Sequence, residues 1–134
     1  MILRTLTAAA VAASFCLAAP AAAEQSTLTR IKETSTIKLG YRENSPPFSF
    51  AADDKKAQGY SVDLCMRVAD DIARQLGIAK LTVQWVPVSA QSRFDAVKNG
   101  EIDLECGNST QTLSRRADFD FSLMTFVDGA SLLY

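Results

Sequence analysis

The stretch GYSVDLCMRVADDIARQLGIAKLTVQWVP (residues 59–87) contains the pattern that decides the fold. Four apolar side chains recur in it at spacings of three and four residues, as on one face of a helix: Cys65, Val68, Ile72 and Leu76. We expect Ser61 to cap this helix and Gly77 to end it. Residues 81–87 then alternate apolar and polar side chains up to a proline, which predicts a strand. A helix that leads directly into a strand is typical of an α/β fold.

The flanking sequence continues the alternation of strands and helices. On the N-terminal side it predicts a short helix capped by Ser26 or Thr27, a strand over residues 36–41, a short strand over residues 48–50 and a polar, hairpin-like loop over residues 51–59. On the C-terminal side it predicts a short helix over residues 92–98, a strand over residues 102–105 and one or two strands over residues 119–133. Together these elements predict a three-layer α/β fold around a parallel sheet.

The first 23 residues have the composition of a secretory signal peptide. Arg4 provides a positive start, residues 5–19 contain no charge, and residues 21–23 are alanines of the kind found at a cleavage site. A membrane anchor is the alternative, but the uncharged stretch is marginal in length and Pro20 interrupts it. We therefore expect cleavage before Glu24 and export, with residues 24–134 as the mature chain.

The composition of the 134 residues excludes several classes of function. A net charge of −1 argues against a nucleic-acid-binding protein, and the absence of histidine leaves zinc, haem and serine-triad chemistry poorly supplied. We expect no metal and no cofactor.

In the exported chain only Cys65 and Cys106 remain, and an oxidising compartment permits a disulfide between them. Two unpaired buried thiols are the alternative, because sequence alone does not supply the geometry.

Three arginines follow predicted strands, where ligands of open α/β sheets bind. Arg42 follows the first strand, Arg93 opens the helix after the strand of residues 81–87, and Arg115 follows residues 102–105. The loop before Arg115 is rich in hydroxyl and amide side chains, which together with guanidinium groups suit a carboxylate ligand. Isolated arginines are more often solvated surface residues, so this pattern by itself leaves both interpretations open.

Four motifs occur in order along the chain: IKLGYR with PPFS (residues 37–42 and 46–49), GYSVDL (59–64), EIDLECG (101–107), and Arg115 followed by DFS (120–122). They resemble family 3 of the bacterial periplasmic solute-binding proteins. The turn at Arg42, residues 86–88 and the Cys106-Gly107 pair most resemble its glutamate/aspartate-binding branch. The resemblance implies a type II periplasmic-binding-protein-like fold. It also implies the substrate-binding component of an ABC importer, monomeric at full length, which delivers an amino acid to an inner-membrane permease.

The resemblance also implies roles for individual residues. Arg115 and Thr110 match the pair that binds the α-carboxylate of the ligand, and Arg42 and Arg93 match arginines near its side-chain carboxylate. Ala90 stands where a ligand-contacting serine is expected, next to Ser89, and an asparagine replaces another expected serine. The implied ligand-binding set is Arg42, Ser89, Arg93, Asn108, Thr110 and Arg115.

Length is the main departure from the family, whose members have two lobes and bind the ligand between them. We expect residues 24–134 to be a partial first lobe without the second, which by itself binds weakly or not at all and exposes a sheet edge. Two alternatives are an enzyme similar to cyclohexadienyl dehydratases on the same fold and the ligand-sensing domain of a larger receptor. Asp103 and Glu105 alternate on one strand and offer no tuned acid/base pair, and we interpret them as a solvated edge.

Overall fold

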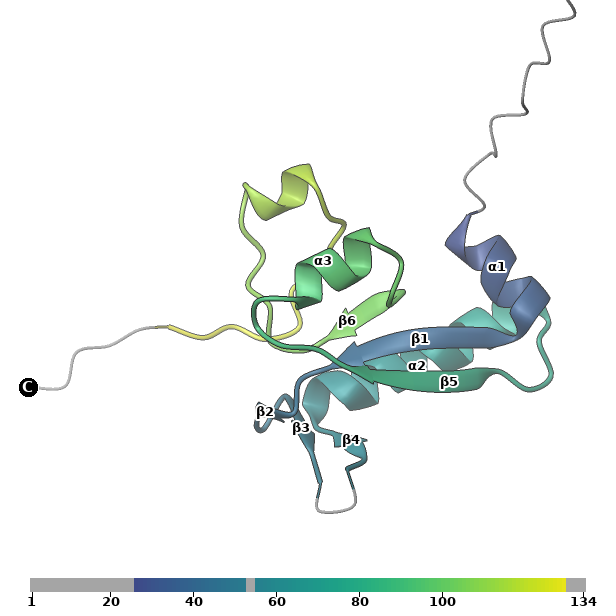
Figure 1. The fold of residues 1–134 in the computed structure, drawn as a ribbon, viewed down its shortest axis with the longest axis horizontal. Coiled ribbons are helices and arrows are strands. Elements are labelled where there is room, and N and C mark those ends of the chain that lie inside the picture. The colour runs from purple at the N-terminus through teal and green to yellow at the C-terminus, as the bar shows by residue number, and fades with distance from the viewer. Residues whose placement is uncertain (1–25, 53–54, 130–134) are drawn as a thin grey trace, which may run out of the picture.

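The computed structural model of the protein describes residues 26–52 and 55–129 (Figure 1). The predicted signal peptide and its cleavage site lie outside these residues, so their assignment stays a prediction. The elements, in chain order, are α1 (Thr27–Thr34), β1 (Thr36–Tyr41), β2 (Asn44–Ser45), β3 (Ser49–Ala51), β4 (Ala57–Gln58), α2 (Tyr60–Leu76), β5 (Thr82–Pro87), α3 (Arg93–Lys98), β6 (Leu104–Cys106) and a short 3₁₀ helix, η1 (Arg115–Ala117). No helix in the described part of the chain is both long and apolar enough to cross a membrane.

The main sheet is parallel, as predicted, with the strand order β5-β1-β6. Leu39 of the central strand pairs with Trp85 on one side and Leu104 on the other. A second, antiparallel sheet has the order β2-β3-β4, and its β3-β4 pair confirms the predicted hairpin. All three parallel strands therefore end at the same edge, where the segments that follow them meet.

Apolar side chains cover both faces of the parallel sheet, which confirms the three layers. Helices α1 and α2 pack on one face around a buried core made of Ile31, Ile37, Leu39, Cys65, Ala69 and Cys106. Helix α3 packs on the other face, where the buried residues are Val88, Ala96 and Ile102. Figure 1 shows α2 running behind β1 and β5, with α3 beside β6. The face covered by α3 is the one that carries the candidate site.

The two ends of helix α2 differ in how well they were predicted. Gly77 ends the helix in a left-handed conformation, as expected. Ser61, however, is not the cap: Gly59 is, and the N–H groups of Tyr60 and Ser61 donate to the carbonyls of Pro47 and Phe48. Because backbone carbonyls already accept from the first turn, the Ser61 hydroxyl is free to donate to the Gly107 carbonyl at 2.7 Å. At α1 the prediction holds, since the Ser26 hydroxyl accepts from the N–H of Thr29.

The strands predicted over residues 119–133 are wrong as far as residue 129; residues 130–133 lie outside the described chain. Residues 119–129 form no strand, and Leu123 is 91% exposed. The apolar pattern is there, but a strand also needs a neighbouring strand to bond with its backbone. Tyr60 donates one hydrogen bond to the Thr125 carbonyl, and no strand of the described chain runs alongside.

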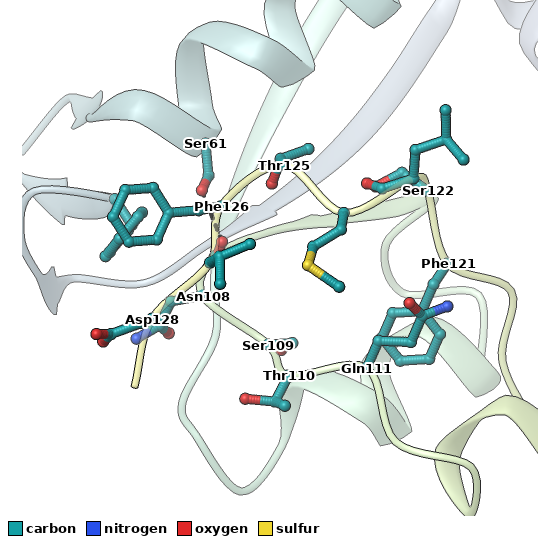
Figure 2. Close-up of a pocket in the computed structure, with 15 residues that line it drawn as sticks. Ser61, Asn108, Ser109, Thr110, Gln111, Phe121, Ser122, Thr125, Phe126 and Asp128 are labelled. Carbon is teal, nitrogen blue, oxygen red and sulfur yellow. Dashed lines mark hydrogen bonds between the residues drawn. The ribbon is translucent and has the colours of Figure 1, made fainter. Parts of the chain in front are cut away.

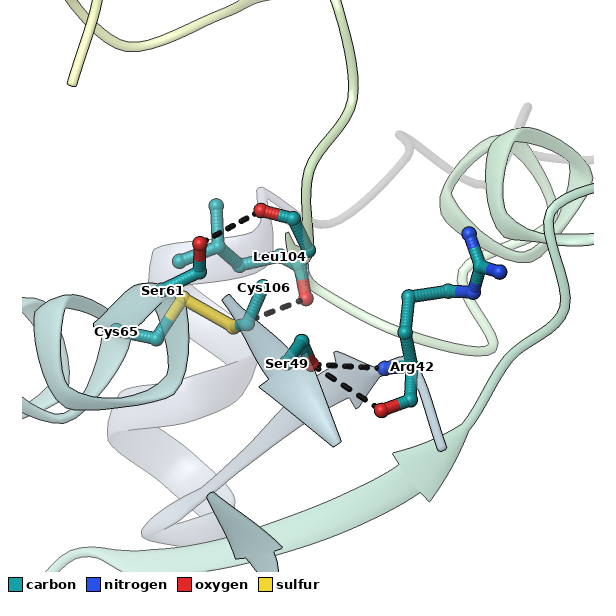
Figure 3. Close-up of a disulfide and its surroundings, with 7 residues drawn as sticks. Arg42, Ser49, Ser61, Cys65, Leu104 and Cys106 are labelled. Carbon is teal, nitrogen blue, oxygen red and sulfur yellow. Dashed lines mark hydrogen bonds between the residues drawn. A yellow bond between two sulfur atoms is a disulfide. The ribbon is translucent and has the colours of Figure 1, made fainter. Parts of the chain in front are cut away.

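A disulfide joins Cys65 of α2 to Cys106 of β6 (Figure 3). The two Cα atoms lie 6.1 Å apart, which is within the usual range. The pairing confirms the predicted disulfide and excludes the alternative of two free thiols. It ties the long helix directly to the strand that enters the candidate site.

We expect Gly59→Ala to destabilise the protein by about 3 kcal/mol. Gly59 has a φ of 124°, and an added Cβ would collide with the Phe48 carbonyl, which cannot move without breaking the start of α2. Urea unfolding measures the loss. Gly77→Ala is the matched control, because its φ of 70° is also left-handed but its Cβ would meet open space. We expect about 1 kcal/mol there, and equal losses in the two variants would contradict the role of the close approach.

Candidate ligand-binding site

Arg42 leaves the end of β1 with its backbone held by a fully buried hydroxyl (Figure 3). The Arg42 N–H donates to Ser49 Oγ at 2.9 Å, and that hydroxyl lies 3.4 Å from the Arg42 carbonyl, to which it donates. Both backbone groups of Arg42 are thus satisfied by one side chain from β3. Sequence reasoning placed Ser49 in a motif but did not identify this positioning role.

Arg93 and Arg115 contact the same aromatic ring. Their guanidinium carbons lie 5.1 Å and 4.7 Å from the centroid of Phe94. Cations are attracted to aromatic faces at such distances. The Phe94 ring in turn packs against Phe119, with centroids 5.2 Å apart. Residues from α3 and η1, far apart in sequence, are therefore brought together by a phenylalanine that sequence reasoning had not singled out.

Electrostatics connect Arg42 to this pair. Burial lowers the pKa of the Arg93 guanidinium, and the positive charges of Arg42 and Arg115 lower it further, while Glu105 raises it. Arginine nevertheless keeps its charge in proteins. Arg42 and Arg115 therefore each lie within electrostatic reach of Arg93. We call Arg42, Arg93 and Arg115 the arginine cluster.

Glu105 is partly buried beside Arg42 and Arg93, with its Oε1 atom shielded from solvent, which corrects the interpretation of a solvated edge. Burial raises the pKa of its carboxyl group, while the positive charges of Arg93 and Arg42 act in the opposite direction. The Ser109 hydroxyl is also close enough to favour the charged form, although it does not meet hydrogen-bond geometry with the carboxylate. The sequence showed the alternation of acidic residues but not which of them the fold would bury.

Asp103 is buried as well, but it has a structural role. Its side chain is 7% exposed and pairs with Arg30 of α1, while its second oxygen accepts the Lys38 N–H at 2.8 Å. This carboxylate therefore connects α1 to the sheet. The two acidic residues that alternate in the sequence serve different parts of the molecule.

Four buried polar atoms around the cluster have no hydrogen-bond partner among the residues that the structure describes: Arg42 Nε, Arg93 Nε, Glu105 Oε1 and Ser109 Oγ. Buried polar groups of folded proteins are almost always paired. Two donors, one acceptor and one hydroxyl therefore converge on a place that suits a small polar ligand. Within the described ranges, no group of histidine, cysteine or acidic side chains could hold a metal ion.

A cavity of about 530 Å³ has Ser109 in its lining (Figure 2), whereas none of the three arginines lines it. Residues 107–111 form one side and residues 121–128 the other, with Ser61 and Phe48 completing the lining. Asn108 and Thr110, both predicted ligand contacts, line this cavity. The Thr110 carbonyl also accepts a hydrogen bond from Arg115 Nη1 at 2.7 Å. This bond orients the Arg115 guanidinium relative to residues 107–111.

Ser89 lies apart from these groups, in the turn that begins α3. Its exposed hydroxyl accepts from the N–H groups of Gln91 and Ser92 and lies 3.0 Å from Ser92 Oγ. These bonds occupy the hydroxyl in a local turn. Three of the six predicted residues thus form the arginine cluster and two line the cavity. Ser89 lies in the turn before α3. Their roles as ligand contacts stay predictions.

Known proteins resemble this chain in sequence and in fold. The model of bacterial extracellular solute-binding proteins, family 3, matches residues 37–134. The chain is 40% identical over 87% of its length to the L-glutamate/L-aspartate-binding protein of Pseudomonas aeruginosa. It is 37% identical, also over 87%, to the glutamate/aspartate import solute-binding protein of Escherichia coli. It covers 40% and 38% of those two proteins.

A solved structure shares the fold. This is the crystal structure of an ancestral amino acid-binding protein, a precursor of cyclohexadienyl dehydratase, which superposes with a TM-score of 0.62 at 28% identity. The superposition covers 73% of this chain and 40% of that one. The predicted type II periplasmic-binding-protein-like fold is confirmed.

Proposed function

Since the chain belongs to the bacterial extracellular solute-binding proteins of family 3, we propose that it forms part of the substrate-binding component of an amino-acid ABC importer and binds an acidic amino acid. The observation that carries the proposal is the arginine cluster: Arg93 and Arg115 share the Phe94 ring, and the positive charge of Arg42 acts on Arg93. A dicarboxylic amino acid has two anionic groups that such a cluster can bind. The names of the two bacterial relatives agree with this ligand class.

In this proposal Arg115 and the Thr110 hydroxyl bind the α-carboxylate, and Arg42 and Arg93 lie near the side-chain carboxylate. Asn108, on the cavity wall, adds an amide donor, and Ser89 contributes only if its turn opens. Charge-assisted hydrogen bonds contribute about 1.5–3 kcal/mol each. Two or three of them provide much of the roughly 8 kcal/mol that micromolar affinity requires.

The remaining parts of the proposal concern the whole protein. We propose export by cleavage of residues 1–23, a periplasmic location, a monomeric state and a permease in the inner membrane as partner. The chain spans about 40% of the length of the relatives it matches, and we propose that a second lobe closes over the ligand. Without it the ion pairs are open to water, which weakens them.

A titration followed by ¹H–¹⁵N NMR tests the ligand class and detects millimolar as well as micromolar binding. L-Glutamate and L-aspartate should shift the signals of residues 107–111 and the Nε–H signals of the arginine cluster at lower concentration than L-glutamine does. Equal affinity for acidic and neutral amino acids would overturn the assignment of an acidic ligand. No binding of any amino acid even when the second lobe is present would overturn the function altogether.

A second candidate is an enzyme similar to cyclohexadienyl dehydratases. The likeness to the ancestral precursor favours it, and the buried Glu105, whose carboxyl pKa is raised by burial, is the kind of group that a general acid requires. The substrate, prephenate, also carries carboxylates. Conversion of prephenate with release of product would support the enzyme, whereas binding of glutamate without turnover of prephenate would support the binding protein.

We expect Arg42→Ala to weaken binding of glutamate and aspartate by about tenfold or more while leaving glutamine within about twofold. The reason is that only acidic ligands present a side-chain carboxylate to this guanidinium. The same NMR titration gives the affinities. Lys38→Ala, which removes a positive charge from the same strand but not from the cluster, is the control. Equal losses for acidic and neutral ligands would contradict the assigned position of Arg42.

A further inference from the structure

We propose that Glu105 is a specificity-determining residue of the arginine cluster: its carboxylate offsets part of the positive charge of Arg42 and Arg93 and thereby limits the preference for acidic over neutral amino acids. This inference rests on the proposed function, because it concerns how the same site discriminates between ligands. Neither the predicted ligand set nor the sequence motifs assign a role to this residue.

The strand register brings Glu105 to the cluster. Glu105 pairs with Gly40 of β1, and neighbouring residues of parallel strands point to the same face of the sheet. Gly40 contacts Ile102 of the core beneath α3, so Glu105 points to the face on which Arg93 begins α3. The acidic side chain is thus enclosed between the sheet and the helix that carries an arginine.

Gly107 gives the carboxylate its place. A Cβ at Gly107 would collide with Glu105 Oε1 and would lie 3.2 Å from Cγ of Arg42. The carboxylate therefore folds over the bare Cα of Gly107, beside the stem of Arg42. Gly107, two positions after Glu105, therefore leaves the space that the carboxylate occupies.

The carboxylate affects the arginines through its charge and does not pair with their inner nitrogens. Oε1 of Glu105 and Nε of both Arg42 and Arg93 have no hydrogen-bond partner among the described residues, so none of these atoms is engaged with another. The groups that face Glu105 are these two guanidiniums, the Ser109 hydroxyl and the Gly107 backbone. A ligand carboxylate therefore meets arginines whose positive potential is already reduced.

Burial of this carboxyl group opposes its ionisation. Desolvation raises its pKa despite two neighbouring positive charges, so the charged form costs folding free energy. A buried acid that disfavours stability beside a polar cavity is typical of a functional site. A neutral residue of the same size would fill the same space. The property of Glu105 to test is therefore its charge.

The test compares affinities for L-glutamate and L-glutamine in the unmodified chain and in Glu105→Gln, by NMR titration. The two ligands differ only in a side-chain carboxylate against an amide. Removing one negative charge next to two guanidiniums should raise the glutamate-to-glutamine affinity ratio by about tenfold. A purely structural role would lower both affinities together and leave the ratio unchanged. A ratio that stays within twofold, or falls, overturns the proposal.

Glu101→Gln is the matched control, because it removes the same charge from an exposed position just before β6. Its ratio should equal that of the unmodified chain, and Glu105→Asp, which keeps the charge, should stay within about threefold of it. An equal rise in the Glu101 variant would attribute the effect to net charge and overturn the proposal. If the unmodified chain itself binds both ligands equally, the proposed acidic ligand is wrong. That result is distinguishable from failure of the Glu105 proposal, in which the unmodified chain still prefers glutamate.

The unmodified chain provides a second measurement that does not depend on folding of a variant. Because the pKa of Glu105 is raised, this group takes up its proton at a higher pH than an ordinary carboxyl. The arginines and Ser109 do not titrate in that range. The affinity ratio should therefore rise as the pH is lowered from neutral while it stays above the ordinary carboxyl range, where the side-chain carboxylate of L-glutamate itself remains charged. A ratio that stays flat or falls over that interval overturns the proposal.

Discussion

Arg115→Ala should abolish measurable binding of every amino acid, acidic or neutral. All amino acids share the α-carboxylate that we propose this guanidinium binds. Loss of its charge-assisted hydrogen bonds should cost about 3 kcal/mol or more, which is at least a hundredfold in affinity. Titration with glutamate, aspartate and glutamine measures this. Among the proposed site variants, this one has the largest expected effect because Arg115 is the charged group that binds the carboxylate shared by every ligand.

The structure shows why Arg115 is prepared for this role and provides its control. Arg115 donates to the Thr110 carbonyl and lies over Phe94, so its guanidinium is held on two sides before a ligand arrives. Arg116, the next residue, is exposed and makes no contact with that ring in the described structure. Arg116→Ala should leave affinities within about twofold. Equal losses in both variants, or loss of acidic ligands only, would contradict the assignment to the α-carboxylate.

Removal of the disulfide should cost about 4 kcal/mol of stability in the chain-entropy model. Cys65 and Cys106 are 41 residues apart, so the bridge restricts a long loop of the unfolded chain. The variant with both cysteines replaced by serine should unfold at a much lower urea concentration. Equilibrium unfolding followed by circular dichroism measures the change.

A reducing agent provides the control for the disulfide. It should destabilise the unmodified chain by a similar amount and leave the double-serine variant unchanged. A reductant effect of equal size in both would show that something other than this bridge is responsible. Because Cys106 directly follows Glu105 and precedes Gly107, reduction should also broaden the NMR signals of residues 107–111.

The fold was predictable where local patterns and packing agree. The strand Thr36–Tyr41 has its predicted bounds, and Gly77 ends α2 as expected. In both places the signal lies within a few residues of the feature it determines. Residues 119–129 failed for the opposite reason, because a strand depends on a distant neighbour to pair with and an apolar pattern does not show whether one exists.

The charged residues of the site were predictable, but the residues that position them were not. The three arginines follow strands of a parallel sheet, and such strands end together, so their approach follows from topology. Ser49, Phe94 and Glu105 gave no comparable signal. Each acts through a contact that spans elements: a hydroxyl of β3 on Arg42, a ring shared by two arginines, and a carboxylate folded over Gly107.

The sequence by itself determined the α/β alternation, the family and the cysteines and arginines available for pairing and binding. These depend on residue type and spacing along the chain, which the sequence contains directly. Only the tertiary structure decided that Ser61 bonds to Gly107 instead of capping its helix, and that Glu105 is buried against positive charge while Asp103 holds α1. Burial and electrostatic environment are set by residues distant in the chain, so they arise only when the sheet and its helices pack together.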